Sequence, residues 1–325
     1  MKLPRRKFLQ LAAGAAALPA LPRYALALDY PTRPIHLIVG FPPGGVNDLY
    51  ARLIGQWLSE RLGQQVVVEN RSGAGGNIAT EFVARAAPDG YTLLLTSSVD
   101  AWNTAIYDHL NFNYLRDIAP VASITQGFGV MEVGPSFPMK TVPEFIAYAK
   151  ANPGTVNMAT GGPGSGPHVY GELFKVMAGV DLVTVHYRGV GPELPELMSG
   201  RVQVGFDPIA ASIAYIKAGK LRPLGVTATR HLDVLPDVPP ISDFVPGYEA
   251  RAWSGIGAPA KTPQEIIIIL NGEVNAVLAD PTFKARILDF GSEPFANSPG
   301  EFAKFIVEYT EKWAKVIRAA GIKAE

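Results

Sequence analysis

The feature that most constrains the fold of this chain is a regular alternation of short apolar runs and amphipathic segments. The first run is PIHLIVGF, and after the loop FPPGG the apolar residues recur at helical spacing as far as Leu62, just before Gly63. QQVVVEN, NIATEFVARAA and YTLLLTSS then continue the pattern as strand, helix and strand. Strands that alternate with helices of this length predict a parallel sheet with helices packed on it.

A second series of the same kind follows Met139. Its predicted helices are PEFIAYAKANPG, HVYGELFKVMAG, PELPELMSG and IAASIAYIKAGK, and its predicted strands are VNMAT, LVTVHY, VQVGF and LRPLGVTA. The C-terminal part contains successive helices without strands between them, so these helices must bury their apolar faces on a sheet already formed. We therefore expect an α/β protein with two lobes, each a mostly parallel sheet flanked by helices. Lobe 1 comprises residues 28–128 plus 253–325, lobe 2 comprises residues 129–252, and two chain crossings form a hinge.

Residues 1–27 have the features of an export signal. A basic start precedes an apolar run rich in Ala and Leu, and the triplet Ala25-Leu26-Ala27 suits cleavage by a signal peptidase. Arg5 and Arg6 resemble a twin-arginine signal, and the alternative is a general secretory signal that contains two arginines by chance. In both cases we expect the mature chain to begin near Leu28. No later segment approaches the ~20 unbroken apolar residues of a transmembrane helix, so we expect a soluble mature protein.

Composition excludes several classes of function. Lys plus Arg equals Asp plus Glu at 29 each, so the chain has no basic field for nucleic acid. It has no cysteine, which excludes disulfides, thiolate metal sites and a cysteine nucleophile. The five histidines are scattered without an i, i+4 pair, so no metal site is predicted. GPGSGPH lacks the Lys-Ser/Thr ending of a phosphate-binding loop, and GAGGN lacks the third glycine of a dinucleotide fingerprint, so no nucleotide cofactor is predicted.

The loops that follow the predicted strands are rich in glycine, proline and hydroxyl groups. Ligands of open α/β sheets bind at these carboxyl ends of the strands. The main-chain N–H groups of Gly44, Gly45, Val46 and Asn47 lie at a predicted helix start, where they have no intrahelical acceptor and the helix dipole favours an anion. This loop therefore predicts a carboxylate site, and ATGGPGSGPH predicts a matching one in the second lobe. The alternative for each single loop is an ordinary glycine-proline turn.

Other side chains in these loops leave more than one interpretation open. Asp48 either stabilises the first turn of its helix through the dipole or holds an ordered water or a donor group of the ligand. Ser165, His168 and Asp207 are the residues that a secreted α/β hydrolase would use. Pro163, however, stands where the G-x-S-x-G motif requires its first glycine, so the sequence does not favour that enzyme.

Four long stretches of the chain resemble the Bug-type (Bordetella uptake gene) extracytoplasmic solute-binding proteins, the receptors of tripartite tricarboxylate transporters. These stretches are residues 30–54, 69–95, 159–206 and 224–263. The resemblance implies a periplasmic two-lobed binding protein of the Venus-flytrap type (type II-like). Such a protein captures a small carboxylic acid, which is a dicarboxylate, a tricarboxylate or an aromatic acid, and delivers it to the membrane permease subunits. We expect a monomer with no enzymatic activity, cofactor, metal or nucleic-acid partner. A sensory binding protein that reports to a membrane kinase uses the same kind of cleft and stays an alternative.

The resemblance also implies a set of ligand-binding residues. In the family, the loops that match residues 41–48 and 160–168 close on the ligand from opposite lobes. Together with the loop residues described above, the predicted ligand-binding residues are Phe41, Gly44, Gly45, Val46, Asp48, Gly76, Asn77, Ser97, Ser98, Thr160, Ser165, His168, Tyr187 and Asp207. The variable end of the pocket is expected to include Ser98, Trp102 and Phe206. The chain departs from the family pattern at two places. Gly40 stands where family members usually have proline, and the segment PPISDFVPGYE differs from the commoner family sequence. These departures leave open whether lobe closure and contacts with the transporter are typical of the family.

Overall fold

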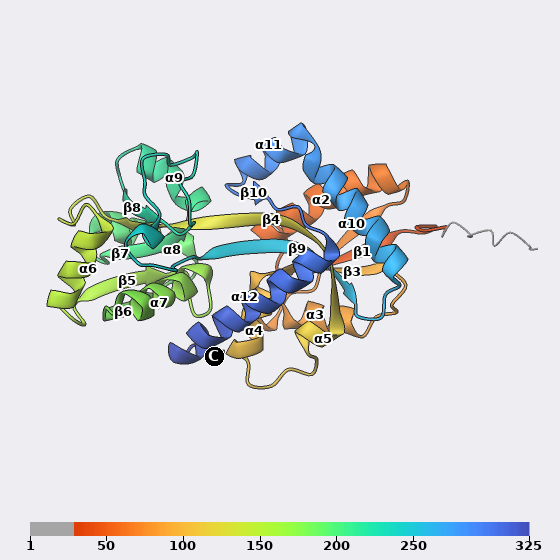
Figure 1. Ribbon diagram of the computed structural model, residues 1–325, viewed down its shortest axis with the longest axis horizontal. Helices are drawn as coiled ribbons and strands as arrows, with labels where there is room; N and C mark the ends of the chain where they lie inside the picture. The colour runs from red at the N-terminus through yellow and green to blue at the C-terminus, as the bar shows by residue number, and fades with distance from the viewer. Residues whose placement is uncertain (1–28, 325) are drawn as a thin grey trace, which may run out of the picture. The chain divides into compact units, whose positions relative to one another are not determined.

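The computed structural model describes residues 29–324, shown in Figure 1. The predicted export signal with its twin-arginine sequence, and the expected start near Leu28, lie outside the described residues. The first elements of the chain are β1 (Ile35–Val39), α2 (Val46–Leu62), β2 (Val66–Asn70), the 3₁₀ turn η1 (Ala74–Gly76), α3 (Asn77–Ala84), β3 (Thr92–Ser97), α4 (Ser98–Ile106) and α5 (Tyr114–Asp117). β1 pairs in parallel with β2 and with β3, which confirms the predicted alternation.

The second series also folds as predicted. Its elements are α6 (Val142–Ala151), β5 (Val156–Thr160), α7 (Gly166–Ala178), β6 (Leu182–His186), α8 (Val190–Ser199), β7 (Val204–Pro208), α9 (Ile209–Lys217), β8 (Arg222–Val226) and the 3₁₀ turn η2 (Ile241–Asp243). β5 pairs in parallel with β6 and with β7. In Figure 1 these green elements gather around β5, β6 and β7.

Two long strands, β4 (Ile118–Val133) and β9 (Arg251–Pro259), lie side by side and connect the two series (Figure 1). β4 is antiparallel to β9 from Ile118 to Phe128, and from Gly129 to Val133 it is antiparallel to β7 and β8 instead. The strand order through residues 29–324 is therefore β2-β1-β3-β9-β4-β7-β5-β6, with β8 and β10 also paired with β4. The sheet is thus mixed: its outer strands are parallel as expected, and the strands around β4 and β9 are antiparallel.

The C-terminal helices pack on the first series, as their apolar faces require. α10 (Gln264–Ala279), α11 (Pro281–Asp289) and α12 (Pro299–Ala319) are interrupted only by the short strand β10 (Glu293–Pro294), which the sequence did not predict. α10 contacts α2 and β4, and α12 contacts α4 and β4 as well as α7 of the second series. The rings of Trp102, Tyr170 and Trp313 meet between α4, α7 and α12, with ring centroids 5.9 to 6.3 Å apart.

Within residues 29–324 no single helix has the length and apolar character of a membrane span. α10 and α11 reach both only when they are counted together, and they are bent by 78° at their junction.

Candidate functional site

A cavity of about 240 Å³ lies where the two series of elements face each other across β4 and β9. Four helices begin at this cavity, and residues of their first turns or the residues just before them line it. They are Val46 and Asn47 of α2, Ser97 and Ser98 at the start of α4, Gly166 and Pro167 of α7, and Pro208 and Ala210 at the start of α9. All four helices follow parallel strands, so the cavity occupies the position that ligands take in open α/β sheets.

The cavity has donor groups but no charged wall. Among the described residues that line it, none is Lys, Arg, His, Asp or Glu. The first N–H groups of each helix lack intrahelical acceptors, and the helix dipole places partial positive charge at the same end. Within the described part of the chain the N–H groups of Val46 and Asn47 have no acceptor. Four helix N-termini at one uncharged cavity form an environment that favours an anion.

Asp48 holds the loop before α2 in place. Its carboxylate accepts hydrogen bonds from the main-chain N–H of Gly44, from Arg52 Nε and from Asn70 Nδ2, each at 2.9 Å. Burial raises the pKa of Asp48, but the bonds from Arg52, Gly44 and Asn70 outweigh it and keep the pKa below its ordinary value. The structure thus adds a third role for Asp48, which is to tie the loop before α2 to Arg52 and Asn70. The N–H of Gly44 is therefore donated within the loop, and neither Gly44 nor Gly45 lines the cavity.

Phe41, Gly76 and Asn77 lie behind the helix starts rather than in the cavity wall. Asn70 Nδ2 also donates to the carbonyl oxygen of Phe41 at 2.9 Å, and Asn77 Oδ1 accepts from Asn103 Nδ2 at 3.0 Å. Through these bonds Phe41 and Asn77 connect the loops before α2 and α3 with the end of β2 and with α4.

The fold explains why glycine occupies position 40. A Cβ atom at this position would lie 2.7 Å from the Cα of Gly76, which is too close for any side chain. The loops before α2 and α3 therefore depend on glycine at Gly40 for their close approach.

Two predicted serines do line the cavity. Ser97 and Ser98 are both buried there, at the junction of β3 and α4. Asp100 accepts the N–H of Ser97 at 2.8 Å and the hydroxyl of Thr80 at 2.6 Å. The start of α4 is therefore fixed by a buried carboxyl group whose pKa is raised by burial.

The predicted residues of the second series lie beside the cavity rather than in its wall. Ser165 is the N-cap of α7 and accepts the N–H of His168. His168 Nδ1 lies 3.1 Å from the N–H of Gly164, and burial lowers the pKa of His168 to about 4, so the ring is neutral and accepts this bond. Thr160 Oγ1 lies 2.8 Å from His186 Nδ1, and the N–H of Tyr187 donates to the carbonyl oxygen of Thr160.

Two predicted residues of β7 lie in the core rather than in the cavity wall. Phe206 was expected at the variable end of the pocket, but it is fully buried in the core and packs on Phe174 with ring centroids 5.2 Å apart. Asp207 was expected to bind ligand, but it is fully buried with two other carboxyl groups, those of Glu132 and Glu193. Trp102, by contrast, lines the cavity as expected.

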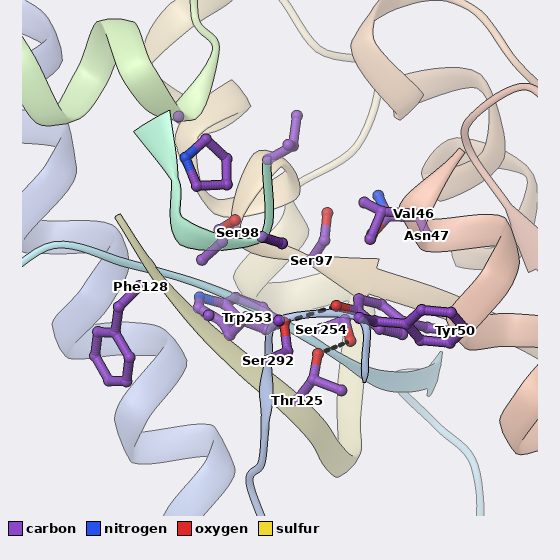
Figure 2. A pocket seen from close by; sticks show the side chains of 18 of the residues that line it. Val46, Asn47, Tyr50, Ser97, Ser98, Thr125, Phe128, Trp253, Ser254 and Ser292 are labelled. Carbon is purple, nitrogen blue, oxygen red and sulfur yellow. Dashed lines mark hydrogen bonds between the residues drawn. The ribbon is translucent and has the colours of Figure 1, made fainter. Parts of the chain in front are cut away.

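The floor of the cavity consists of residues that the sequence did not predict. Tyr50 Oη lies 2.7 Å from Ser292 Oγ, and Thr125 Oγ1 lies 2.7 Å from Ser254 Oγ. Figure 2 shows these two hydroxyl pairs below the helix starts that carry Val46, Asn47, Ser97 and Ser98. Tyr50 follows Val46 by one helical turn, and this i, i+4 spacing was the one sequence pattern that could have placed Tyr50 at the cavity. The other three come from β4, β9 and the segment after α11, whose meeting depends on the whole fold.

Comparison with known proteins agrees with this arrangement. Residues 50–322 match the family described as tripartite tricarboxylate transporter family receptor. Protein BugT of Bordetella pertussis (strain Tohama I) is 34% identical over 297 residues, which cover 90% of this chain and 91% of BugT.

Solved structures show the same fold. The structure described as "R. palustris Rpa4515 with adipate" is 36% identical, covers 90% of this chain and 99% of its own, and has a TM-score of 0.77. MatC (Rpa3494) from Rhodopseudomonas palustris with bound malate is 31% identical, covers 89% of this chain and 100% of its own, and has a TM-score of 0.73. The resemblance to Bug-type proteins is confirmed, and the chain belongs to the family of tripartite tricarboxylate transporter receptors.

Proposed function

We infer that this receptor is a non-enzymatic periplasmic protein that binds a small carboxylic acid in the cavity and delivers it to the permease subunits of its transporter. The observation that carries this proposal is the convergence of four helix N-termini on a cavity without a charged wall. The relatives solved with adipate and with malate support a carboxylate as the ligand. We expect the exported protein to act as a monomer.

The absence of catalysis is supported by the contacts of the three residues that a hydrolase would use. Within residues 29–324 no hydrogen bond joins the hydroxyl of Ser165 to the imidazole of His168, and none joins His168 to Asp207. Ser165 caps a helix, and Asp207 is enclosed with other carboxyl groups. A nucleophile, a base and an orienting acid in mutual contact are what acyl transfer requires.

Closure of the lobes is the step that brings the remaining predicted residues to the ligand. We take lobe 1 as residues 28–128 plus 253–325 and lobe 2 as residues 129–252, in line with the change of pairing partners of β4 after Phe128. In this proposal the donors of lobe 1 are the main-chain N–H groups of Val46 and Asn47, because the N–H of Gly45 is donated to the carbonyl oxygen of Pro42. Their counterparts in lobe 2 are the groups around Thr160, Ser165, His168 and Tyr187.

The test is a change of charge at the start of α2. Val46 lines the cavity and is 54% exposed, so Val46→Glu adds a negative charge without burying it. A glutamate in the first turn also suits the helix dipole, which keeps the helix stable. Two like charges about 8 Å apart at an effective dielectric constant of about 20 repel by about 2 kcal/mol, which corresponds to roughly 30-fold weaker binding.

Isothermal titration of the mature chain with a panel of carboxylic acids measures this effect. Val46→Gln is the matched control, because it has the same size as Val46→Glu without the charge, and it should stay within about threefold of wild type. Equal losses in both variants would show that the site does not hold an anion near α2. A wild-type protein that binds no carboxylate would reject the proposed function itself.

A further inference from the structure

The walls of the cavity between its donor end and its floor are aromatic. The side chains of Tyr50, Trp102, Phe128, Tyr170, Trp253 and Phe290 line it. Several of these rings already pack edge to face, with Trp102 and Tyr170 at 6.3 Å and Tyr50 and Phe290 at 5.9 Å between centroids. Rings in this arrangement favour a flat apolar body, and they leave the hydroxyl groups of a polar ligand without partners.

Three cations on the elements around the cavity are engaged by other groups. Arg52 of α2 is paired with Asp48, and Lys175 of α7 is paired with Glu172. Arg251 of β9 donates to Gln126 Oε1 and stacks on the ring of Phe305 at 4.7 Å. The helix N-termini can bind one carboxylate of a ligand. A second carboxylate at the floor would be buried without a counter-charge, and hydrogen bonds alone do not offset the free energy of its desolvation.

The floor offers uncharged hydrogen-bonding groups. Each pair uses one O–H on its partner, and the Tyr50 hydroxyl also interacts with the hydroxyl of Thr125, so the four hydroxyls together keep one O–H to donate and lone pairs to accept. A neutral group that both donates and accepts, such as a hydroxyl, matches this floor better than a carboxylate, which only accepts.

We propose that the ligand is an aromatic monocarboxylic acid with an uncharged hydrogen-bonding group at the end opposite its carboxylate. The carboxylate lies at the starts of α2, α4, α7 and α9, the ring lies against Trp102, Tyr170 and Trp253, and the neutral group lies at the paired hydroxyls. This inference rests on the proposed function, because it assigns a class of ligand to the same site.

Titration of the full mature protein with five probes tests the inference. The probes are 4-hydroxybenzoate, benzoate, terephthalate, malate and citrate. We expect 4-hydroxybenzoate to bind roughly three- to tenfold tighter than benzoate, the value of one net hydrogen bond. We expect both to bind at least tenfold tighter than terephthalate, malate or citrate. Equal or tighter binding of terephthalate, malate or citrate would overturn the inference.

The double variant Thr125→Val/Ser254→Ala tests the floor directly. It removes both partners of one hydroxyl pair and keeps their approximate shapes, which limits the effect on folding. The preference for 4-hydroxybenzoate over benzoate should then fall to about one. Thr310→Val is the control, because this buried hydroxyl donates to Ile306 within α12 and does not line the cavity. Its preference should match wild type, and an unchanged preference in the double variant would reject the role of the Thr125–Ser254 pair.

The two proposals fail in distinguishable ways. If no carboxylic acid binds, or if Val46→Glu and Val46→Gln weaken binding equally, the proposed function fails. If malate or citrate binds tightly and only Val46→Glu weakens it, the receptor function stands and the aromatic class is wrong.

Discussion

Replacing Glu193 by glutamine should change how the stability of this protein depends on pH. Glu193 of α8, Glu132 of β4 and Asp207 of β7 are each fully buried, and no cation pairs with them within residues 29–324. Ser212 donates to Glu132 at 2.5 Å, but both carboxyl oxygens of Glu193 and of Asp207 have no donor from other residues. The three carboxyl groups must therefore share protons among themselves, and together they do not form a metal-binding group.

The magnitude follows from proton linkage. Burial, the hydrogen bond with Asp207 and the nearby charges of Asp207 and Glu132 raise the pKa of Glu193 from 4.5 to about 10. Between these two pH values the folded protein keeps this proton and the unfolded chain has lost it, so the free energy of unfolding falls as pH rises. One proton is worth about 1.4 kcal/mol per pH unit, which amounts to about 2.7 kcal/mol between pH 6 and pH 8.

Glu193→Gln removes this proton while it keeps the size of the side chain and an N–H donor toward Asp207. The melting temperature of wild type should fall between pH 6 and pH 8 by about 5 °C more than that of the variant, at roughly 2 °C per kcal/mol for a chain of this size. Thermal unfolding at fixed ionic strength measures both slopes. Glu196→Gln on the same helix is the control, since Glu196 is partly exposed and pairs with Arg201. Parallel curves for wild type and Glu193→Gln would refute the shared-proton cluster.

Two glycine substitutions test the packing around the cavity, with Gly272→Ala as control because a Cβ there meets no atom within 4 Å. Gly40→Ala should reduce the free energy of unfolding in urea by about 1 to 3 kcal/mol, since its Cβ would lie 2.7 Å from the Cα of Gly76. A change in the free energy of unfolding like that of the control would show that the two loops are free to separate. Gly291→Ala should weaken ligand binding by about tenfold in calorimetry, because φ at this position is +69° and the new Cβ would lie 2.3 Å from the Cβ of Ala210, which also lines the cavity. Wild-type affinity would contradict that close contact.

The alternating parts of the fold were predictable because each element has a local signal. PIHLIVGF became β1, YTLLLTSS became β3, and Gly63 ends α2 in the left-handed conformation. Such runs carry their period and their stop residue within about twenty residues of sequence. The start of α2 near Val46 was therefore predictable, whereas the helix that begins at Ser98 was not predicted.

β4 was not predicted because its sequence contains residues that normally interrupt strands. Pro120 lies where the register of β4 with β9 shifts, so its missing N–H is tolerated. A Cβ on Gly129 would lie 3.2 Å from the carbonyl oxygen of Asp207 and 3.3 Å from the ring of Tyr170. This glycine, which reads as a turn signal in the sequence, serves the close approach of β7 and α7 to the strand. Because that function depends on residues 40 to 80 positions away, no local pattern reveals it.

The dependence on distant residues also explains why the burial of Asp207 could not be predicted from the sequence. Asp207 follows an apolar strand at its carboxyl end, which is where ligand-binding residues of α/β sheets occur. Its neighbour Pro208 does line the cavity, but Asp207 points into the cluster, where Gly205 leaves it room: a Cβ on Gly205 would lie 2.5 Å from Asp207 Oδ2. If the cluster ionised, its negative charges would lie directly behind a site proposed for an anion. Burial raises the pKa of all three carboxyl groups, which favours their protonated forms and so reduces the negative charge that lies one residue from the cavity.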